Sequence, residues 1–329
     1  MIRRVLMAFL LAAAAGACYL FYSIGAPYKG FDKEVFVDIP SGTSTRGIAR
    51  LLEDSGVIRS QWVFLAARSV EPRVSLKAGE YHFRTPASAM EVFRRITGGD
   101  IFYYELSVPE GSNQFDIAAA LQQLGVIKAA DFLKIAANPS LILDLAPDAP
   151  SLEGFLFPAT YRVTRHTSPQ QMCKDMTGRF RRAWKELGAP SAQVSRSVTL
   201  ASLVEKESAV PADRPIVASV FENRLARKMT LDCDPTTIYA ALLENRYRGT
   251  IYRSDLDSTN PYNTYKHAGL PPGPIANPGL AALKAAIAPA RTDYLYFVAK
   301  PGGSGSHTFS SSLEQHNLAV RAYRNGAKH

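Results

Sequence analysis

The feature that most constrains this chain is an uninterrupted apolar run from Val5 to Ile24, which contains no charged side chain. Its 20 residues correspond to a helix of about 30 Å, which matches the hydrocarbon thickness of a bilayer. Arg3 and Arg4 precede the run and favour retention of that end in the cytoplasm. We therefore expect residues 1–25 to be a single transmembrane anchor, with everything after it exported.

Two alternatives for this segment stay open. A signal peptide cleaved after Ala14 to Ala17 would have a shorter apolar region, of about 7 to 15 residues. Lipidation at Cys18 is disfavoured because Ala15 stands where a lipobox normally has Leu, and because the run continues past the cysteine. The only other cysteines are Cys173 and Cys233, so an exported chain permits a disulfide between them without requiring one.

The rest of the chain has the composition of a globular protein. Among 329 residues, 47% are hydrophobic and 20% are charged, which argues against a disordered or fibrous chain. The length allows roughly two domains of about 150 residues each. The net charge of +9 suits an anionic polymer, a membrane surface or nucleic acid, and export makes nucleic acid an unsuitable partner.

An internal repeat with a period of 69 residues follows the anchor. Each copy predicts a short strand, a Pro-x-Gly turn and an amphipathic helix that stops at a glycine. The strands are expected at Val35 to Ile39 and at Tyr104 to Val108. The recurring residues are Pro40, Gly42, Ile48, Ala49, Leu52, Gly56, Val57 and Ile58, matched by Pro109, Gly111, Ile117, Ala118, Leu121, Gly125, Val126 and Ile127.

Both copies lie in a region expected at residues 34–137, which a Pro-rich stretch from Asn138 to Pro150 closes. With a helix predicted at Gln61 to Ser69, the first copy resembles a LysM-like module, a type associated with N-acetylglucosamine polymers. The alternative is a packing unit that binds nothing. In either case Ile48 and Leu52, on the predicted helix of the first copy, should be buried. The same holds for their counterparts in the second copy, Ile117 and Leu121.

Residues 150–329 predict a mainly helical domain with a small β element, so the expected fold class is α+β. Tyr262 to Gly279 is crowded with Pro, Gly and Asn, and such long irregular segments are usually functional loops. The predicted elements are helices at Pro169 to Leu187, Ala192 to Ala209, Asp213 to Lys228, Pro235 to Glu244 and Ser311 to Arg324, and a strand at Tyr294 to Ala299.

Two glutamates stand out on the predicted helix from Ala192 to Ala209. Glu205 and Glu207 both fall within its wide apolar arc, and an apolar setting raises the pKa of a carboxyl toward the range of a general acid. The two side chains point about 200° apart, so only one enters a given cleft. Periodicity does not choose between them, and either one is alternatively a buried structural carboxylate paired with an arginine such as Arg214 or Arg224.

The run from Ala201 to Tyr239 resembles the signature of the YceG-like (MltG) endolytic murein transglycosylases. It contains A-S-L-V-E-K-E-S-A-V, V-A-S-V-F-E-N-R-L and L-D-C-D-P-T-T-I-Y. Further matching segments are L-E-G-F-L-F-P-A-T-Y from Leu152, Y-N-T-Y from Tyr262, G-L-P-P-G-P-I-A-N-P-G from Gly269, Y-L-Y-F-V from Tyr294 and H-T-F from His307. With the anchor and the LysM-like region, the resemblance covers nearly the whole chain.

The resemblance implies that Glu207, the second glutamate of E-K-E, is the catalytic residue, and that Glu205 supports the site. Two departures from the family's pattern are Ala159, where an acidic residue is often found after L-F-P, and Cys233, where a polar residue is commoner. The substrate-binding or supporting residues expected within the matching motifs are Glu153, Asn223, Asp234, Tyr262, Asn263, Tyr265 and His307.

For some of these residues a structural role is the alternative. Tyr262, Asn263 and Tyr265 have a composition suited to stacking on sugar rings and hydrogen bonding acetamido groups, but Asn263 also suits a turn. His307 is expected to orient substrate or to serve as a structural hydrogen bonder. No Cys or His spacing resembles a metal site and no Gly-rich loop precedes a helix, so we expect neither metal nor cofactor.

The implied activity is endolytic cleavage of the bond between N-acetylmuramic acid and N-acetylglucosamine, giving 1,6-anhydro ends on strands trimmed or terminated at the inner membrane of a bacterium. Implied partners are peptidoglycan glycan strands and the peptidoglycan synthases. Two other functions stay open. One is a noncatalytic peptidoglycan-binding scaffold, and the other is a muramidase that uses water and a second carboxylate among Asp213, Asp232 and Asp234.

Overall fold

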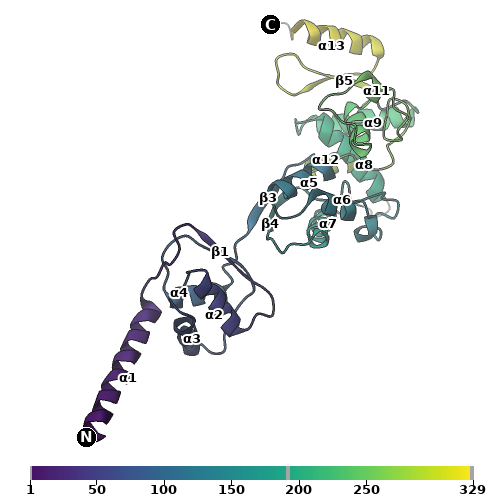
Figure 1. Ribbon diagram of the computed structural model, residues 1–329. Helices are drawn as coiled ribbons and strands as arrows, with labels where there is room; N and C mark the ends of the chain where they lie inside the picture. The colour runs from purple at the N-terminus through teal and green to yellow at the C-terminus, as the bar shows by residue number, and fades with distance from the viewer. Residues whose placement is uncertain (1, 190–192, 327–329) are drawn as a thin grey trace. The chain divides into compact units, whose positions relative to one another are not determined.

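The computed structural model describes residues 2–189 and 193–326, which divide into two compact units. Unit 1 comprises the chain up to Tyr104 together with Thr164–His166, and unit 2 comprises Glu105–Val163 with the chain from Thr167 onward. The fold is a mixture of helices and three two-stranded sheets (Figure 1). Ala192, where a helix is predicted to begin, lies outside the described residues.

Unit 1 begins with α1 (Ile2–Gly25), whose stretch Arg3–Gly25 is long and apolar enough to cross a membrane. The rest of the unit is one layer of helices on a hairpin-like pair of strands. These elements are β1 (Val35–Ile39), α2 (Thr45–Asp54), α3 (Gln61–Val70), β2 (Gly79–Phe83) and α4 (Ala89–Gly98). β1 and β2 pair antiparallel, with Val37 opposite Tyr81.

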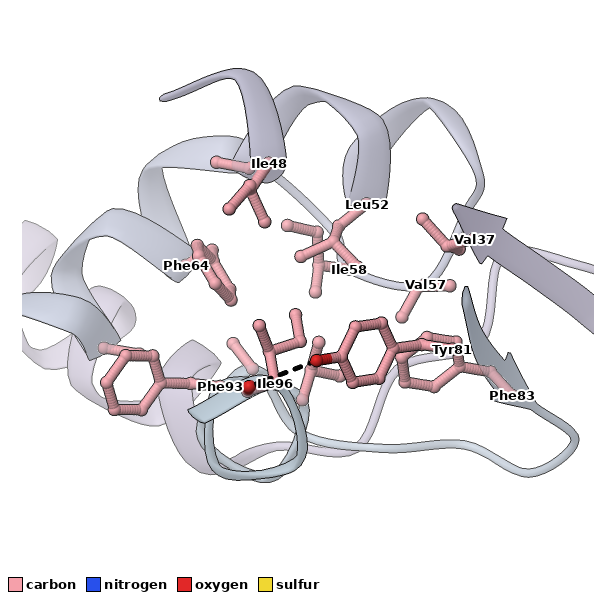
Figure 2. Close-up of a cluster of buried hydrophobic side chains, with 14 of the residues drawn as sticks. Val37, Ile48, Leu52, Val57, Ile58, Phe64, Tyr81, Phe83, Phe93 and Ile96 are labelled. Carbon is pink, nitrogen blue, oxygen red and sulfur yellow. Dashed lines mark hydrogen bonds between the residues drawn. The ribbon is translucent and has the colours of Figure 1, made fainter. Parts of the chain in front are cut away.

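The core of unit 1 fills the space between the sheet and the three short helices (Figure 2). Tyr81 is fully buried, and its hydroxyl donates to the carbonyl oxygens of Lys77 at 2.8 Å and Ile96 at 3.2 Å. Ile48 and Leu52 face this core, at 3% and 0% exposure, as the repeat predicts. Other members are Val37, Val57, Ile58, Phe64, Phe83 and Phe93.

Unit 2 opens with the second copy of the repeat and continues into a helical bundle. Its elements are β3 (Tyr104–Val108, whose first residue belongs to unit 1), α5 (Gln114–Gln123), α6 (Ala129–Ala136), the 3-10 turn η1 (Pro139–Leu141), β4 (Ala159–Val163), α7 (Pro169–Glu186), α8 (Val194–Glu207), α9 (Arg214–Ala226), α10 (Asp234–Leu243), α11 (Arg253–Leu256), α12 (Leu280–Ile287), β5 (Tyr296–Ala299), β6 (His307–Ser310) and α13 (Leu313–Gly326). β3 pairs with β4, and β5 pairs antiparallel with β6.

The repeat is longer than the sequence predicted. β1 and α2 recur as β3 and α5 at an offset of 69 residues, and β2 and α4 recur as β4 and α7 at an offset of 80. Tyr161 is the counterpart of Tyr81, and its hydroxyl also donates to the carbonyl four residues earlier, that of Phe157. Ile117 and Leu121 are buried, at 1% and 0% exposure, so this part of the prediction is confirmed.

Helix α8 is the central element of unit 2, because α9, α10 and α12 all pack against it. Every residue from Ser197 to Val204 is buried. Thr199 and Ser202 are therefore internal, and their hydroxyls bond to backbone groups. Thr199 donates to the Ser195 carbonyl at 2.8 Å, and Ser202 accepts from the Ile275 N–H at 3.1 Å.

Candidate active site

The two glutamates of E-K-E lie in the last turn of α8, and they have different surroundings. The helix ends at Glu207, two residues earlier than predicted, because Ser208 adopts an extended conformation. Glu207 extends toward Cys233 at the start of α10, whereas Glu205 extends toward Arg214 at the start of α9. The structure thus separates two carboxyls that periodicity left equivalent.

Glu207 lines a cavity of about 400 Å³. Burial raises the pKa of its carboxyl above the ordinary value, and the nearby carboxylate of Asp234 acts in the same direction. A hydrogen bond from Cys233 and the positive charge of Arg224 oppose that rise in pKa. The other residues that line the cavity are Phe221, Leu231, Asp232, Pro235, Tyr265, Tyr296, Phe297, Leu313 and His316.

Cys233 is the direct hydrogen-bond partner of Glu207. Its thiol donates to Glu207 Oε1 at 3.1 Å, while its backbone N–H donates to Thr264 Oγ1 at 3.1 Å. Burial and the neighbouring Glu207 raise the pKa of the thiol well above its usual value, so it stays protonated and remains a donor. All three cysteines are free thiols, and the permitted disulfide with Cys173 is not formed.

Glu205 is held by two strong donors. Arg214 Nη2 lies 2.7 Å from Glu205 Oε1, and the Gly279 N–H donates to Oε2 at 2.9 Å. Burial raises the pKa of Glu205, while the Gly279 N–H and the Arg214 charge oppose that rise in pKa. Arg214 is itself buried and also donates to the Ser208 carbonyl at 3.1 Å, so it joins the end of α8 to the start of α9. This is the structural pairing that the sequence left as an alternative.

Glu153 is a buried hub that lies apart from the cavity lining. Its carboxyl accepts from the Gln114 N–H at 2.9 Å and from Asn277 Nδ2 at 2.8 Å. Burial raises the pKa of Glu153 to about 8, so the group is mostly neutral at pH 7. Gly154 follows with φ +86°, and a Cβ there would lie 2.4 Å from Pro274. The L-E-G segment therefore requires glycine at this close approach.

Asn263 organises the Y-N-T-Y loop from within. It is fully buried, and its Nδ2 donates to the carbonyl oxygens of Leu256 at 3.0 Å and Ser258 at 2.7 Å. Its Oδ1 accepts from the Tyr265 N–H at 3.1 Å. All of these bonds stay within the loop, so the structure places Asn263 among the supporting residues.

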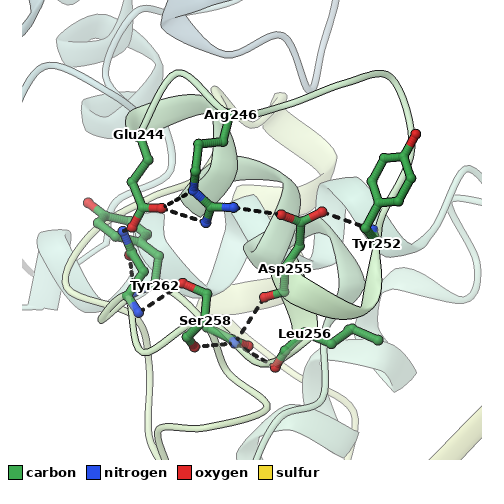
Figure 3. Close-up of polar contacts among 9 residues, drawn as sticks. Glu244, Arg246, Tyr252, Asp255, Leu256, Ser258 and Tyr262 are labelled. Carbon is green, nitrogen blue, oxygen red and sulfur yellow. Dashed lines mark hydrogen bonds and ion pairs between the residues drawn. The ribbon is translucent and has the colours of Figure 1, made fainter.

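The loop before Asn263 is stiffened by an ionic network (Figure 3). Arg246 Nη1 donates to Asp255 Oδ1 at 2.9 Å, and its Nε donates to Glu244 Oε2 at 2.6 Å. The second oxygen of Asp255 accepts from the Tyr252 N–H at 2.9 Å. This network fixes the segment that presents Thr264 and Tyr265 to the start of α10.

The two tyrosines of this loop lie in different places. Tyr265 lines the cavity with Glu207, and its hydroxyl donates to Asp234 Oδ1 at 2.7 Å. Tyr262 packs instead on Tyr239, with ring centroids 5.1 Å apart, and burial raises its pKa to about 12. The structure thus brings Tyr265 and Asp234 to the cavity, while Tyr262 lies in the aromatic packing behind it.

Asn223 and His307 make structural contacts. Asn223 Nδ2 donates to the carbonyl oxygens of Thr292 and Tyr294, each at 2.9 Å, which holds the segment before β5 against α9. His307 Nδ1 lies 3.0 Å from Asp213 Oδ2, and the same oxygen accepts the His307 N–H at 2.7 Å. Neither side chain is among those that line the cavity.

Sequence reasoning missed Arg224, Tyr296 and His316 as residues of the cavity. Arg224 was considered only as an ion-pair partner, but it donates to the carbonyl oxygens of Leu231 at 3.0 Å and Leu295 at 2.7 Å. Its guanidinium also lies 5.2 Å from the centre of the Tyr296 ring. The motif F-E-N-R-L placed Arg224 four residues before Lys228 on a predicted helix, and no local pattern indicates contacts with a strand 71 residues away.

A larger cavity, of about 610 Å³, lies along α7 and has a different character. It is lined by exposed cationic side chains, and its one carboxylate is Asp175. The smaller cavity differs because its wall carries Glu207, a carboxyl whose pKa is raised by burial and which therefore suits proton donation to a glycosidic leaving group.

A carboxyl with a raised pKa on the wall of a cavity is the feature expected of an enzyme that uses general acid catalysis. The chain belongs to the YceG-like family, whose model matches residues 37–322. It is 35% identical over 309 residues to an endolytic murein transglycosylase of Bacillus subtilis, covering 88% of this chain and 84% of that protein.

Two further comparisons agree with this family. An endolytic murein transglycosylase of Streptococcus pneumoniae is 30% identical over 325 residues, which cover 89% of this chain and 59% of that longer protein. A crystal structure of a YceG-like protein from Listeria monocytogenes matches with a TM-score of 0.54 and 32% identity, covering 88% of this chain and 99% of the other.

Proposed function

We propose that this chain is an endolytic lytic transglycosylase of peptidoglycan, with Glu207 as its general acid and general base. The bond cleaved joins N-acetylmuramic acid to N-acetylglucosamine, and the product ends in 1,6-anhydro-N-acetylmuramic acid. The observation that carries the proposal is the buried Glu207 carboxyl on the wall of a cavity, in a chain 35% identical to a protein named endolytic murein transglycosylase.

The chemistry needs one carboxyl that changes role. Glu207, protonated at the start, gives its proton to the glycosidic oxygen of the leaving N-acetylglucosamine as the bond to the muramic acid C1 breaks. The resulting carboxylate takes the proton of the C6 hydroxyl, whose oxygen forms the new bond to C1. Glu207 is again protonated at the end. No water enters the reaction, because the nucleophile is tethered to the same sugar.

The cavity favours this cycle in two ways. Its apolar side chains, including Phe221 and Leu231, raise the pKa of Glu207 and so keep the proton available. The Cys233 thiol gives the carboxylate formed in the first half of the cycle a hydrogen-bond donor. We assign substrate contact to Tyr265 and Asp234, and support of the site to Glu153, Glu205, Asn223, Tyr262, Asn263 and His307.

A muramidase is the second candidate, and one observation keeps it in view. Asp232 and Asp234 line the same cavity as Glu207, whereas the Asp213 carboxylate is hydrogen-bonded to His307. Asp234 accepts from Tyr265, and Asp232 lies 3.1 Å from Arg224. A water-activating role for either carboxylate would replace anhydro ends with reducing ends.

The remaining parts of the proposal concern location. We propose that residues 1–25 are a single-pass anchor in the inner membrane, that 34–137 form a LysM-like region and that 150–329 form the catalytic domain on the periplasmic side. Support comes from the apolar helix Arg3–Gly25 and the repeated strand-turn-helix units. Proposed partners are glycan strands, which are trimmed or terminated near the membrane, and the peptidoglycan synthases.

The test is digestion of purified uncrosslinked glycan by the full-length protein in detergent, with products read by mass spectrometry. We expect anhydro ends from the wild type. Glu207→Gln should lower the rate by at least about 10² to 10⁴, because an amide cannot give or take the proton. Glu205→Gln, which loses a supporting ion pair, should lower the rate less.

Matched circular dichroism and thermal melts would show that both variants are folded. Full activity of Glu207→Gln would remove Glu207 from the mechanism. Reducing ends would instead identify a muramidase, and absence of any cleavage by the wild type would favour a binding scaffold.

A further inference from the structure

The end of α1 is packed into unit 1, while the rest of the helix is bare. Ser23 is buried and Ile24 packs against the core of the unit, whereas the aromatic residues Tyr19, Phe21 and Tyr22 are exposed. Helix α3 contacts α1, and Figure 1 shows it beside the C-terminal end of that helix. Helix α3 therefore lies at the level where an anchor ends.

The connection between α1 and the rest of unit 1 is short and tied. Only Ala26 and Pro27 separate α1 from Tyr28, so the three Cα–Cα steps from Gly25 to Tyr28 span at most roughly 10 Å. Tyr28 exchanges backbone hydrogen bonds with Ala87, at 3.0 and 3.2 Å. The Arg59 guanidinium covers the Tyr28 ring at 5.0 Å. Unit 1 is thus held at the end of α1 and is not suspended on a flexible linker.

Two of the three exposed residues of α3, Trp62 and Val70, are large and apolar, and the third is Ser69, whose hydroxyl is bonded to the Ala66 carbonyl of the same helix. Val63, Phe64 and Ala67 are buried, but Trp62 and Val70 are 63% and 62% exposed. At about 100° per residue the two positions are roughly 80° apart around the helix axis, so they lie on the same half of its surface. A helix on the surface of a globular protein normally has polar or charged residues on its outer face. The outer face of α3 therefore has the composition of a surface that is covered.

The charged residues in and around α3 lie near its two ends. Arg68 is its one charged residue, and its guanidinium donates to the Glu71 carbonyl and lies 6.0 Å from the centre of the Phe93 ring. Arg59 precedes the helix and Arg73 follows it, with Glu71 as the carboxylate between them. An apolar helix face with cationic ends complements a layer of anionic lipid headgroups.

We infer that α3 lies in the headgroup region of the bilayer that α1 crosses, with Trp62 and Val70 in contact with lipid. The inference rests on the proposal that α1 crosses a membrane. Tryptophan and tyrosine favour the membrane–water interface, and Tyr19 and Tyr22 lie in the last two turns of α1, next to its junction with the rest of unit 1. Unit 1 is then bound to the membrane by two elements, which fixes its orientation on the surface as well as its distance from it.

The chain offers a direct reporter, because it has only two tryptophans. Trp184 is 4% exposed in unit 2, so the variant Trp184→Phe leaves Trp62 as the sole emitter, and Trp62→Phe leaves Trp184 as the matched control. The full chain is reconstituted in vesicles of phosphatidylcholine and phosphatidylglycerol, with and without bromine on the acyl chains near the headgroup. We expect brominated lipid to quench most of the Trp62 emission and to leave that of Trp184 unchanged.

A charge on the outer face tests the contact itself. Val70→Glu is compatible with the fold because the side chain is exposed. This variant should reduce the quenching of Trp62 emission by brominated lipid and increase its quenching by aqueous acrylamide. Arg50→Glu, an exposed charge change on α2, is the matched control and should leave the quenching by lipid as it is. Flotation of the same samples with the vesicles checks the anchor separately.

For a chain that floats with the vesicles, two results would overturn the inference. One is a Trp62 that is quenched by acrylamide and not by brominated lipid. The other is a Trp62 protected from both quenchers in a concentration-dependent way, which would assign the apolar face to a second copy of the chain. A chain that fails to float would overturn the anchor, and the placement of α3 with it, without affecting the catalytic proposal.

Discussion

The two copies of the repeat have the same local structure and different surroundings. In the first copy the turn after β1 is open, and a Cβ on Gly42 would meet nothing within 4 Å. In the second copy the equivalent Gly111 packs against α8, with Glu205 Cγ at 3.5 Å from such a Cβ. Its N–H donates to the Asn277 carbonyl at 2.9 Å. One copy is a free-standing module, and the other is part of the scaffold of the candidate site.

What the copies share explains their common fold. In both turns the N–H of the third residue after the proline donates to its carbonyl at 3.2 Å, in Thr43 to Pro40 and in Ser112 to Pro109. Both helices are capped by a polar side chain, Ser44 or Asn113. The two copies differ at positions that contact other elements. The fold of the module is therefore determined by local contacts, and a few substitutions determine whether it packs against the candidate site.

The largest effect that sharpens this comparison comes from truncating the same core position in each copy. Leu52→Ala and Leu121→Ala each remove a fully buried side chain and should each cost about 2 to 5 kcal/mol of unfolding free energy in their own unit. Only Leu121→Ala should also lower glycan cleavage, because α5 carries Gln114, which binds Glu153. Denaturant titration and the glycan digestion assay measure the two effects.

Equal losses of cleavage in the two variants, at a temperature where both units remain folded, would contradict the distinction between a free-standing module and a scaffold. The conservative variants Leu52→Met and Leu121→Met serve as controls, because they nearly conserve volume and usually cost less than about 1.5 kcal/mol.

The next largest effect concerns Glu153, a specialisation of the second copy. The position 80 residues earlier is Arg73, which is exposed. Burial raises the pKa of Glu153 to about 8 in the folded protein, against an ordinary value of 4.5, so the unfolded chain loses this proton first as pH rises. The contribution of this group to the free energy of unfolding is therefore fully present below pH 4.5, and it is lost as the pH rises to about 8.

Glu153→Gln should remove that pH dependence, because the amide keeps the neutral shape without a titrating proton. The measurement is the difference in unfolding free energy between wild type and variant from pH 4.5 to 8. The matched control Glu105→Gln, at an exposed position of β3, should leave the slope unchanged. A slope that persists in Glu153→Gln would show that the group is ionised in the folded protein.

A smaller effect is expected at Cys233, which lies outside both copies. A hydroxyl is a stronger donor than a thiol, so Cys233→Ser should stabilise the Glu207 carboxylate and lower the pKa of Glu207. The general acid then loses its proton at a lower pH, and the fall of kcat/KM on the alkaline side should move to lower pH. Cys173→Ser, at a cysteine with no contact to Glu207, should leave the profile unmoved.

The pH profile of kcat/KM for glycan cleavage distinguishes this role from a packing role. A loss of activity in Cys233→Ser with no displacement along the pH axis would mean that the thiol only fills space.

The sequence predicted much of this fold because the strongest signals are local. The three predicted strands match β1, β3 and β5, and the glycines that stop α2 and α5 have φ values of +68°. Strands β2, β4 and β6 were missed, although each pairs with a predicted strand. Of these, β2 and β4 occupy the same place in the two copies of the repeat. Their copies share little beyond Tyr81 and Tyr161, and the longer connection in the second copy shifts the offset, so no ungapped comparison detects them.

The candidate site was less predictable, since its contacts join distant segments. Periodicity identified Glu205 and Glu207 but not their partners Gly279 and Cys233, which are 74 and 26 residues away. For Asn263 the turn chemistry was foreseen, while its full burial was not. Local patterns specify which residue types are unusual, and tertiary structure decides which of them reach the cavity.

The smallest effect is expected where the second turn differs most visibly from the first. Glu110 stands where the first copy has Ser41, and its half-exposed carboxylate lies 3.8 Å from Arg214 Nη1. Exposed ion pairs of this kind contribute about 0 to 1 kcal/mol. Arg214 also keeps its 2.7 Å contact with Glu205 when Glu110 is removed. Glu110→Ser should therefore change the unfolding free energy by less than about 1 kcal/mol and leave cleavage nearly unchanged, as should the reverse exchange Ser41→Glu. If Glu110→Ser instead impaired cleavage as strongly as Glu205→Gln while the unfolding free energy held, the turn of the second copy would belong to the substrate-binding surface and not only to the scaffold behind it.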